Sequence, residues 1–105
     1  MKETNILKEC LMALSKAGVM AWRNNTGALP DSNGRWVSYG LCKGSSDIIG
    51  IAPGGVFIAI ECKAANGRVR PEQQTFIDNI RRMGGRAGVA RSADEAVRIA
   101  LDTAE

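Results

Sequence analysis

Asp47, Glu61 and Lys63 have the residue types and the spacing that metal-dependent chemistry requires. Asp47 precedes the apolar run 48–52, and Glu61 and Lys63 follow the apolar run 56–60. Both runs are rich in β-branched residues and typical of buried strands, and the Pro-Gly-Gly sequence between them predicts a turn. Two carboxylates that lie close together repel each other unless a cation separates them, and Mg²⁺ is bound by one or two carboxylates in this way. The pattern predicts a divalent metal site, and its alternative is a solvated strand end.

The register of this predicted hairpin decides whether the two carboxylates meet. A turn centred on Gly54 pairs Asp47 directly with Glu61, and paired positions have Cβ atoms about 5 Å apart. A turn centred between Gly54 and Gly55 instead places Asp47 opposite Cys62, on the other face of the sheet. The sequence is compatible with both registers.

The composition excludes several other kinds of active site. The chain has no histidine, which rules out Ser-His-Asp and Cys-His catalysis, His-metal sites and histidine general bases. Its three cysteines, Cys10, Cys42 and Cys62, lack the CxxC spacing, so we expect neither a zinc site nor a disulfide framework. No Walker A or GxGxxG motif is present, so we expect no nucleotide cofactor.

These residues carry a family resemblance. Asp47, Glu61 and Lys63 resemble the D…(D/E)xK signature of the PD-(D/E)xK nucleases. More narrowly, the chain resembles the VRR-NUC (virus-type replication-repair nuclease) domain from Glu3 to its last helix. The segments that carry this narrower resemblance are 43–47, 58–63, 67–68, 71–73 and Phe76. Family members commonly have Pro before the Asp, and an aliphatic residue or Pro between Glu and Lys, where this chain has Ser46 and Cys62.

The resemblance implies a role for each residue of the motif. Asp47, Glu61 and the backbone carbonyl of Cys62 would hold Mg²⁺ or Mn²⁺. Lys63 would orient the attacking water and offset negative charge in the transition state. Cys62 in place of the aliphatic residue of other family members removes no ligand, because the ligand would be the backbone carbonyl.

Two residues outside the motif have both a structural and a catalytic interpretation. Glu3 lies on the apolar stripe of a predicted helix, where an acid is favoured by the helix dipole; the family has a metal-supporting acid here, often acting through water. Gln73 faces the apolar side of the helix that Pro71 opens, so its amide needs a partner. That partner is backbone in one interpretation, and in the resembling family a glutamine here belongs to the active site.

Several polar residues near the predicted site are candidate DNA contacts. They are Arg23 and Asn24 at a strand end, Lys43 and Ser45 before Asp47, and Arg68 and Arg70 in the loop after Lys63. Phosphate contacts of this kind position a duplex without reading its sequence. The alternative for each is a solvated loop. A further group, Arg81, Arg82, Arg86 and Arg91, is either a phosphate-binding patch or a set of unrelated surface arginines.

The elements that must position these residues follow from periodicity and turn signals. We expect helices over about 3–16, from Pro71 to Gly84, and after the capping box that begins at Ser92. We expect strands over 19–23, 36–39, 48–52, 56–60 and 86–90, with residues 24–34 as a polar loop that ends in the hairpin signal Asn33-Gly34. The two tryptophans are expected in the core or in a hairpin pair. The fold class is α/β, a mixed central sheet flanked by helices with a PD-(D/E)xK restriction-endonuclease-like core.

The whole chain is expected to form a single nuclease domain over residues 1–105. Its formal charge of +3 permits nucleic acid as a partner, and no run is long enough to span a membrane. A reducing cytoplasm suits the cysteines, in a bacterial host if the protein is phage-encoded. The resemblance implies a homodimer that cuts branched DNA such as four-way (Holliday) junctions. The alternatives are a non-catalytic DNA-binding module and a nuclease subunit that needs a larger partner.

Overall fold

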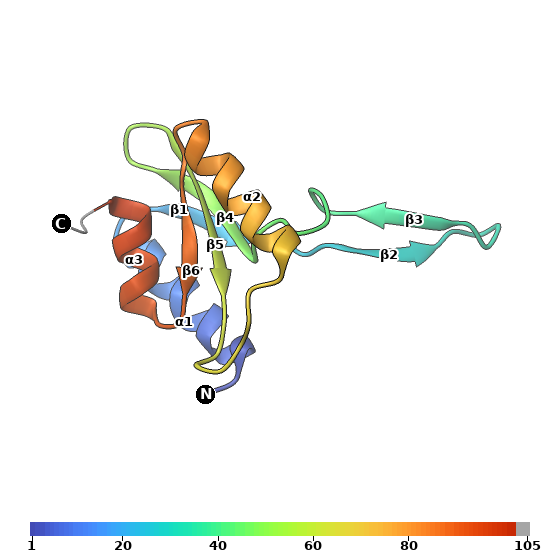
Figure 1. Ribbon diagram of the computed structural model, residues 1–105, viewed down its shortest axis with the longest axis horizontal. Coiled ribbons are helices and arrows are strands. Elements are labelled where there is room, and N and C mark those ends of the chain that lie inside the picture. Colours follow the sequence, from blue (N-terminus) through green and yellow to red (C-terminus); the bar gives the residue numbers. More distant parts are fainter. Residues whose placement is uncertain (103–105) are drawn as a thin grey trace.

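The structure is a computed structural model that describes residues 1–102 (Figure 1). Its elements are α1 (Glu3–Lys16), β1 (Met20–Arg23), β2 (Gly27–Pro30), β3 (Trp36–Tyr39), β4 (Ile48–Ala52), β5 (Val56–Cys62), α2 (Pro71–Arg82), β6 (Arg86–Ala90) and α3 (Ala93–Leu101). No helix within residues 1–102 has the length and the apolar character needed to cross a bilayer.

The centre of the fold is a four-stranded sheet in the order β1-β4-β5-β6. β4 is antiparallel to both β1 and β5, and β6 runs parallel to β5 after the crossover through α2. This confirms the predicted mixed sheet. Helices cover both faces of it (Figure 1), because a sheet with apolar side chains on both faces must bury both.

The two faces of the sheet have separate apolar clusters. On one face, α1 and α3 pack against the sheet, and the predicted stripe of α1 is buried there through Ile6, Leu7, Cys10 and Leu14. On the other face, α2 packs through Ile77 on Ile49, Ala59 and Ala87. Side chains alternate along a strand, so Glu61 lies on the α2 face with Ala59.

The turn between β4 and β5 selects one of the two registers that the sequence permits. Ala52 pairs with Val56 and Ile48 pairs with Ile60, so the hairpin is centred on Gly54. Gly54 and Gly55 have φ of 92° and 79°, a left-handed conformation that favours glycine over other residues. Continued by one residue, this register sets Asp47 opposite Glu61.

One expectation about residues 24–39 is wrong, because the predicted polar loop contains a strand, β2. The predicted strand 36–39 is present as β3, and it pairs with β2 outside the main sheet. The Asn33-Gly34 turn therefore closes a separate two-stranded hairpin. Neither tryptophan is in the core: Trp22 is 45% exposed and Trp36 is 73% exposed, although Trp36 does pair with Pro30 across the hairpin.

Candidate active site

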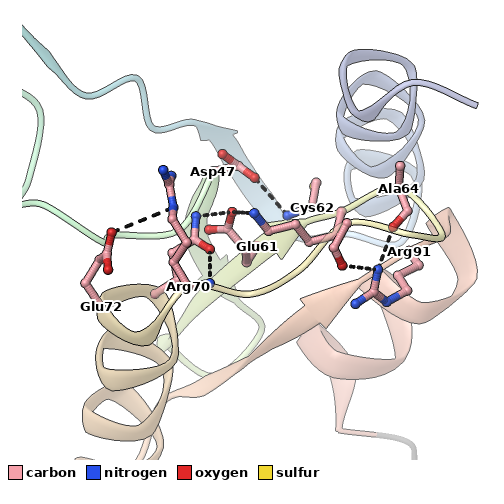
Figure 2. A network of polar contacts seen from close by, with 10 residues as sticks. Asp47, Glu61, Cys62, Ala64, Arg70, Glu72 and Arg91 are labelled. Atoms are coloured by element: carbon pink, nitrogen blue, oxygen red, sulfur yellow. Dashed lines mark hydrogen bonds and ion pairs between the residues drawn. The ribbon is translucent and has the colours of Figure 1, made fainter.

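Asp47 and Glu61 form the centre of the site, at the end of the β4–β5 hairpin. Asp47 Oδ2 accepts a hydrogen bond of 2.8 Å from the backbone N–H of Cys62 (Figure 2). This bond fixes one carboxylate oxygen of Asp47 beside the strand that carries Glu61. The arrangement is the one that the hairpin register centred on Gly54 requires.

Glu61 is a buried carboxyl group with an incomplete set of partners. Its side chain is almost fully enclosed, with Oε2 3.0 Å from the donating Nε2 of Gln73 and 3.6 Å from Nζ of Lys63. Oε1 is buried and has no hydrogen-bond partner among residues 1–102. Burial, followed by the negative charge of Asp47, raises the pKa of Glu61 to about 8, while the ammonium of Lys63 acts in the opposite direction. A carboxylate at this position therefore needs a further positive partner.

Gln73 connects the start of α2 to this carboxyl group. Its Oε1 accepts from the backbone N–H of Arg70, the N-cap residue, at 2.9 Å, and its Nε2 donates to Glu61. One end of the amide thus binds backbone, as the structural interpretation of Gln73 expects, and the other end contacts Glu61; a catalytic role of Gln73 stays a prediction. The side chain is 6% exposed, so both contacts are shielded from water.

Lys63 is buried beside Glu61, and the loop that follows Lys63 is held by Arg91. The sequence suggested for Arg91 only a phosphate-binding patch or an unrelated surface position. Arg91 donates through one terminal nitrogen to the carbonyls of Ala64, Ala65 and Gly67, at 2.5, 3.3 and 2.9 Å (Figure 2). Three converging carbonyls attract a guanidinium but leave no signal in the sequence, since a carbonyl is common to every residue. Arg91 is therefore an internal support of the loop after Lys63.

Glu3 lies at the rim of the site region. It is exposed in the first turn of α1, and its Oε2 would lie 3.3 Å from a Cβ placed on Gly67. Glu3 is thus beside the loop that Arg91 holds. As a metal-supporting acid, it remains a prediction.

The chemistry of the site fits a hard divalent cation. Asp47 and Glu61 supply two carboxylates, and a buried oxygen of Glu61 has no protein partner among the described residues. No group of three or more His, Cys, Asp or Glu side chains within residues 1–102 could hold a metal alone. Mg²⁺ needs no such group, since it keeps several waters and takes substrate phosphate oxygens. The backbone carbonyl of Cys62 is the predicted third protein ligand.

The thiol of Cys62 has no part in this donor set. A hydrogen bond with Cys10 and burial both raise the pKa of the Cys62 thiol, so the group stays protonated and uncharged. Cys62 itself is 1% exposed and belongs to the cluster under α1 and α3, on the opposite face from Glu61. This separation is the reason that the chain can carry Cys where family members commonly have an aliphatic residue.

Two of the predicted DNA contacts, Asn24 and Ser45, bind each other. The amide of Asn24 donates to Ser45 Oγ at 2.8 Å and to the carbonyl of Ser46 at 2.9 Å, and its backbone N–H donates to the carbonyl of Asp47 at 2.7 Å. Asn24 therefore holds the segment that leads into Asp47. Gly44 in this segment approaches α2 closely, since a Cβ there would lie 2.5 Å from the carbonyl oxygen of Glu72.

The other four predicted DNA contacts, Arg23, Lys43, Arg68 and Arg70, are exposed around the site. Arg70 forms an ion pair of 3.7 Å with Glu72 while its side chain stays 69% exposed. The group of four arginines is divided: Arg81 and Arg86 donate to the carbonyls of Ala87 and Ala100, and Arg91 holds the loop described above. The structure therefore gives three of that group internal roles.

Comparison with known proteins agrees with this geometry. The sequence profile of the VRR-NUC domain matches residues 1–94. The chain belongs to the VRR-NUC domain family. A solved structure described as "VRR_NUC domain" is similar over 100% of this chain and 99% of its own, with a TM-score of 0.67 and 21% sequence identity, which supports the shared fold. A comparison with curated proteins finds no match.

Membership of the VRR-NUC family identifies a DNA-processing domain of the nuclease type. Domains of this family generally depend on a divalent metal. The predicted family is thus confirmed, and the predicted fold class with it.

Proposed function

We propose that this protein is a Mg²⁺- or Mn²⁺-dependent DNA endonuclease that hydrolyses phosphodiester bonds. The observation that carries the proposal is the pairing of Asp47 with a buried Glu61 whose Oε1 has no protein partner among the described residues. Such a pair is unfavourable without a cation, and a buried carboxyl group with a strongly raised pKa is characteristic of functional sites.

Asp47, Glu61 and the carbonyl of Cys62 would hold the ion, with Glu3 in support through water. When bound, a divalent ion supplies Lewis acidity to the scissile phosphate and makes an attacking water more acidic. Lys63 orients that water and offsets the negative charge that develops in the transition state, since its Nζ is only 3.6 Å from Glu61 and is largely shielded from solvent. Gln73 keeps Glu61 oriented through its 3.0 Å hydrogen bond.

DNA is held by exposed cations around the site: Arg23, Lys43, Arg68 and Arg70 contact phosphates, and Asn24 and Ser45 shape the backbone beside them. We infer a preference for branched DNA such as four-way junctions, with two sites supplied by a homodimer. This finer part of the proposal is based on the resemblance to VRR-NUC proteins that form homodimers and cut branched DNA.

The test is cleavage of a labelled four-way junction beside a linear duplex of the same sequence, with Mn²⁺, Mg²⁺ or EDTA. Wild type should cut the junction only with a metal, and Glu61→Gln should not cut. Lys63→Ala should lower kcat at least about 100-fold while DNA binding is retained. Lys16→Ala, an exposed lysine at the end of α1, is the matched control.

Each contrary result has a distinct meaning. If Lys63→Ala cuts at the wild-type rate, the role assigned to Lys63 is wrong. Equal cutting of both DNAs would retain the chemistry and remove the branch preference. If wild type binds DNA but does not cut it with any metal, the protein is a binding module or a subunit that needs a partner.

A further inference from the structure

The hairpin of β2 and β3 is the one part of the described chain that lies apart from the sheet and its helices. It projects from the end of β1 as an arm, here residues 27–39, and accounts for the long shape of the molecule, 51 Å by 31 Å by 26 Å (Figure 1). Its strands pair with each other only. A two-stranded hairpin without further packing is marginally stable in water, so the arm needs a partner surface.

Both faces of the arm are apolar. Residues paired across a hairpin share a face, so Leu29, Val37 and Tyr39 lie on one face and Pro30 and Trp36 on the other. Trp36 is 73% exposed and Leu29 is 61% exposed. The arm carries one acidic residue, Asp31, and one basic residue, Arg35, and hence no net charge. A surface that binds DNA phosphates is instead rich in cations, so the chemistry of the arm favours a protein partner.

A second apolar surface lies on the main sheet, where α2 does not cover it. Met20, Ile51 and Phe57 stand side by side on β1, β4 and β5, and Trp22 follows Met20 on the same face of β1. We name these four residues the sheet patch. All four are exposed, Met20 most of all at 61%. α2 covers only the next positions along the sheet, Ile49 and Ala59.

The arm leaves the sheet after Arg23, at the end of β1, and extends away from the sheet (Figure 1), whereas Met20 of the sheet patch lies at the start of β1. We propose that the arm of each copy packs on the sheet patch of a second copy, in a reciprocal, two-fold symmetric dimer. A two-fold contact of this kind uses the same two surfaces on both chains and closes without leaving either exposed. The inference builds on the homodimer proposed above and names its interface.

The available area matches what a stable dimer requires. Aromatic side chains have roughly 150–250 Å² of surface each and aliphatic ones somewhat less, so the exposed fractions of the sheet patch and of the arm face with Leu29, Val37 and Tyr39 amount to roughly 600 Å² of apolar surface per chain. Specific interfaces bury about 800 Å² on each partner, of which roughly 60% is apolar. Aromatic and methionine side chains are also the types enriched at the centres of interfaces, and Trp22, Tyr39 and Met20 supply them.

The proposed contact lies next to the candidate active site. On the α2 face of the sheet, Trp22 and Ile49 lie in the row next to the row of Met20, Ile51 and Phe57. Asp47 and Glu61 occupy the same-face positions that follow along β4 and β5. The partner's arm would therefore form a wall beside each active site. The two sites of the dimer are then fixed relative to each other, as the cutting of two strands requires.

The test measures the mass of the protein in solution without DNA or metal, so it is independent of nuclease activity. Wild type should show twice the chain mass of 11.2 kDa at high concentration. Val37→Lys in the arm and Met20→Lys in the patch should each raise the dimer dissociation constant at least about 30-fold. Met12→Lys, an equally exposed methionine on the opposite side of the sheet, should leave it unchanged.

Wild type that sediments as one chain at every concentration would overturn the proposal. So would variants that keep the wild-type mass; if they also lose DNA affinity, the arm binds DNA instead. Amide hydrogen exchange of wild type gives a second measurement that needs no variant. The amides of the arm and of β1 should exchange more slowly at high protein concentration than at low, and equal exchange would contradict the interface.

Discussion

Glu61 is the residue at which burial and charge are in conflict. The residue is 2% exposed, and burial together with Asp47 raises the pKa of its carboxyl group from 4.5 to about 8. At a pH between 4.5 and 8, Glu61 of the folded protein binds a proton that Glu61 of the unfolded chain does not. Without metal, the contribution of protonated Glu61 to the free energy of unfolding should therefore be complete below pH 4.5. This contribution should be lost as the pH rises through 8.

This dependence is measurable by denaturant unfolding in EDTA at several pH values. Between pH 5 and pH 9, wild type should lose roughly 2 kcal/mol or more relative to Glu61→Gln, whose amide carries no charge at either pH. The comparison with Glu61→Gln removes the contributions of other titrating groups. Parallel pH profiles for the two proteins would show that Glu61 is ionised in the folded state without metal.

At the scale of the element, the loop between β5 and α2 depends on one side chain from the far end of β6. Arg91 donates to three carbonyls of residues 64–67, directly after Lys63. Arg91→Ala should lower the free energy of unfolding by about 1–2 kcal/mol, because those carbonyls lose a charged donor. It should also increase amide exchange in residues 64–67 and slow cleavage by loosening the support of Lys63.

The matched control for Arg91→Ala is Arg82→Ala. Arg82 is an exposed arginine whose side chain, among residues 1–102, binds only the side chain of Asn79, so its loss should cost a few tenths of a kcal/mol. If the two variants were equally stable and equally active, the contacts of Arg91 with the loop would contribute neither to the free energy of unfolding nor to the cleavage rate.

The extent of prediction from sequence also differs between elements. The three helices and the strands of the main sheet are strongly periodic or β-branched, and the structure has them at the expected positions. β2 escaped prediction because Gly27 and Pro30 at its ends are turn formers and its four residues are too few to show alternation. The exposure of the tryptophans could not be foreseen either, since that of Trp36 follows from an arm that leaves the sheet and that of Trp22 from its place on the edge strand β1, which α2 does not cover.

The candidate site was predictable in its residues but not in its connections. Asp47, Glu61, Lys63 and Gln73 were identified from spacing, resemblance and helix phase, and the structure brings these four together. The register that joins Asp47 to Glu61 depends on which glycine centres the turn, and composition alone does not decide that. The internal bonds of Asn24 and Arg91 depend on carbonyl positions, which a sequence does not encode locally.

At the scale of the whole molecule, a bound metal should be visible as stability of the entire fold. The proposed ligands Asp47 and Glu61 come together only when β4 and β5 are paired, so an ion held by them would bind the folded chain and not the unfolded one. Ligand at 100 times its dissociation constant then adds about 2.7 kcal/mol to the free energy of unfolding. For a chain of this size that corresponds to a rise in Tm of roughly 10 °C or more.

Thermal unfolding with Mn²⁺ and with EDTA measures this effect without any DNA. Wild type should melt at a higher temperature in Mn²⁺, and the gain should be larger at pH 8 than at pH 6, because ion binding displaces the proton from Glu61. Asp47→Asn and Glu61→Gln should lose the gain, while Asp78→Asn, an exposed acid on α2, should keep it. A non-catalytic DNA-binding module would show no gain in wild type. The same melts therefore separate a metal enzyme from a binding protein before any substrate is chosen.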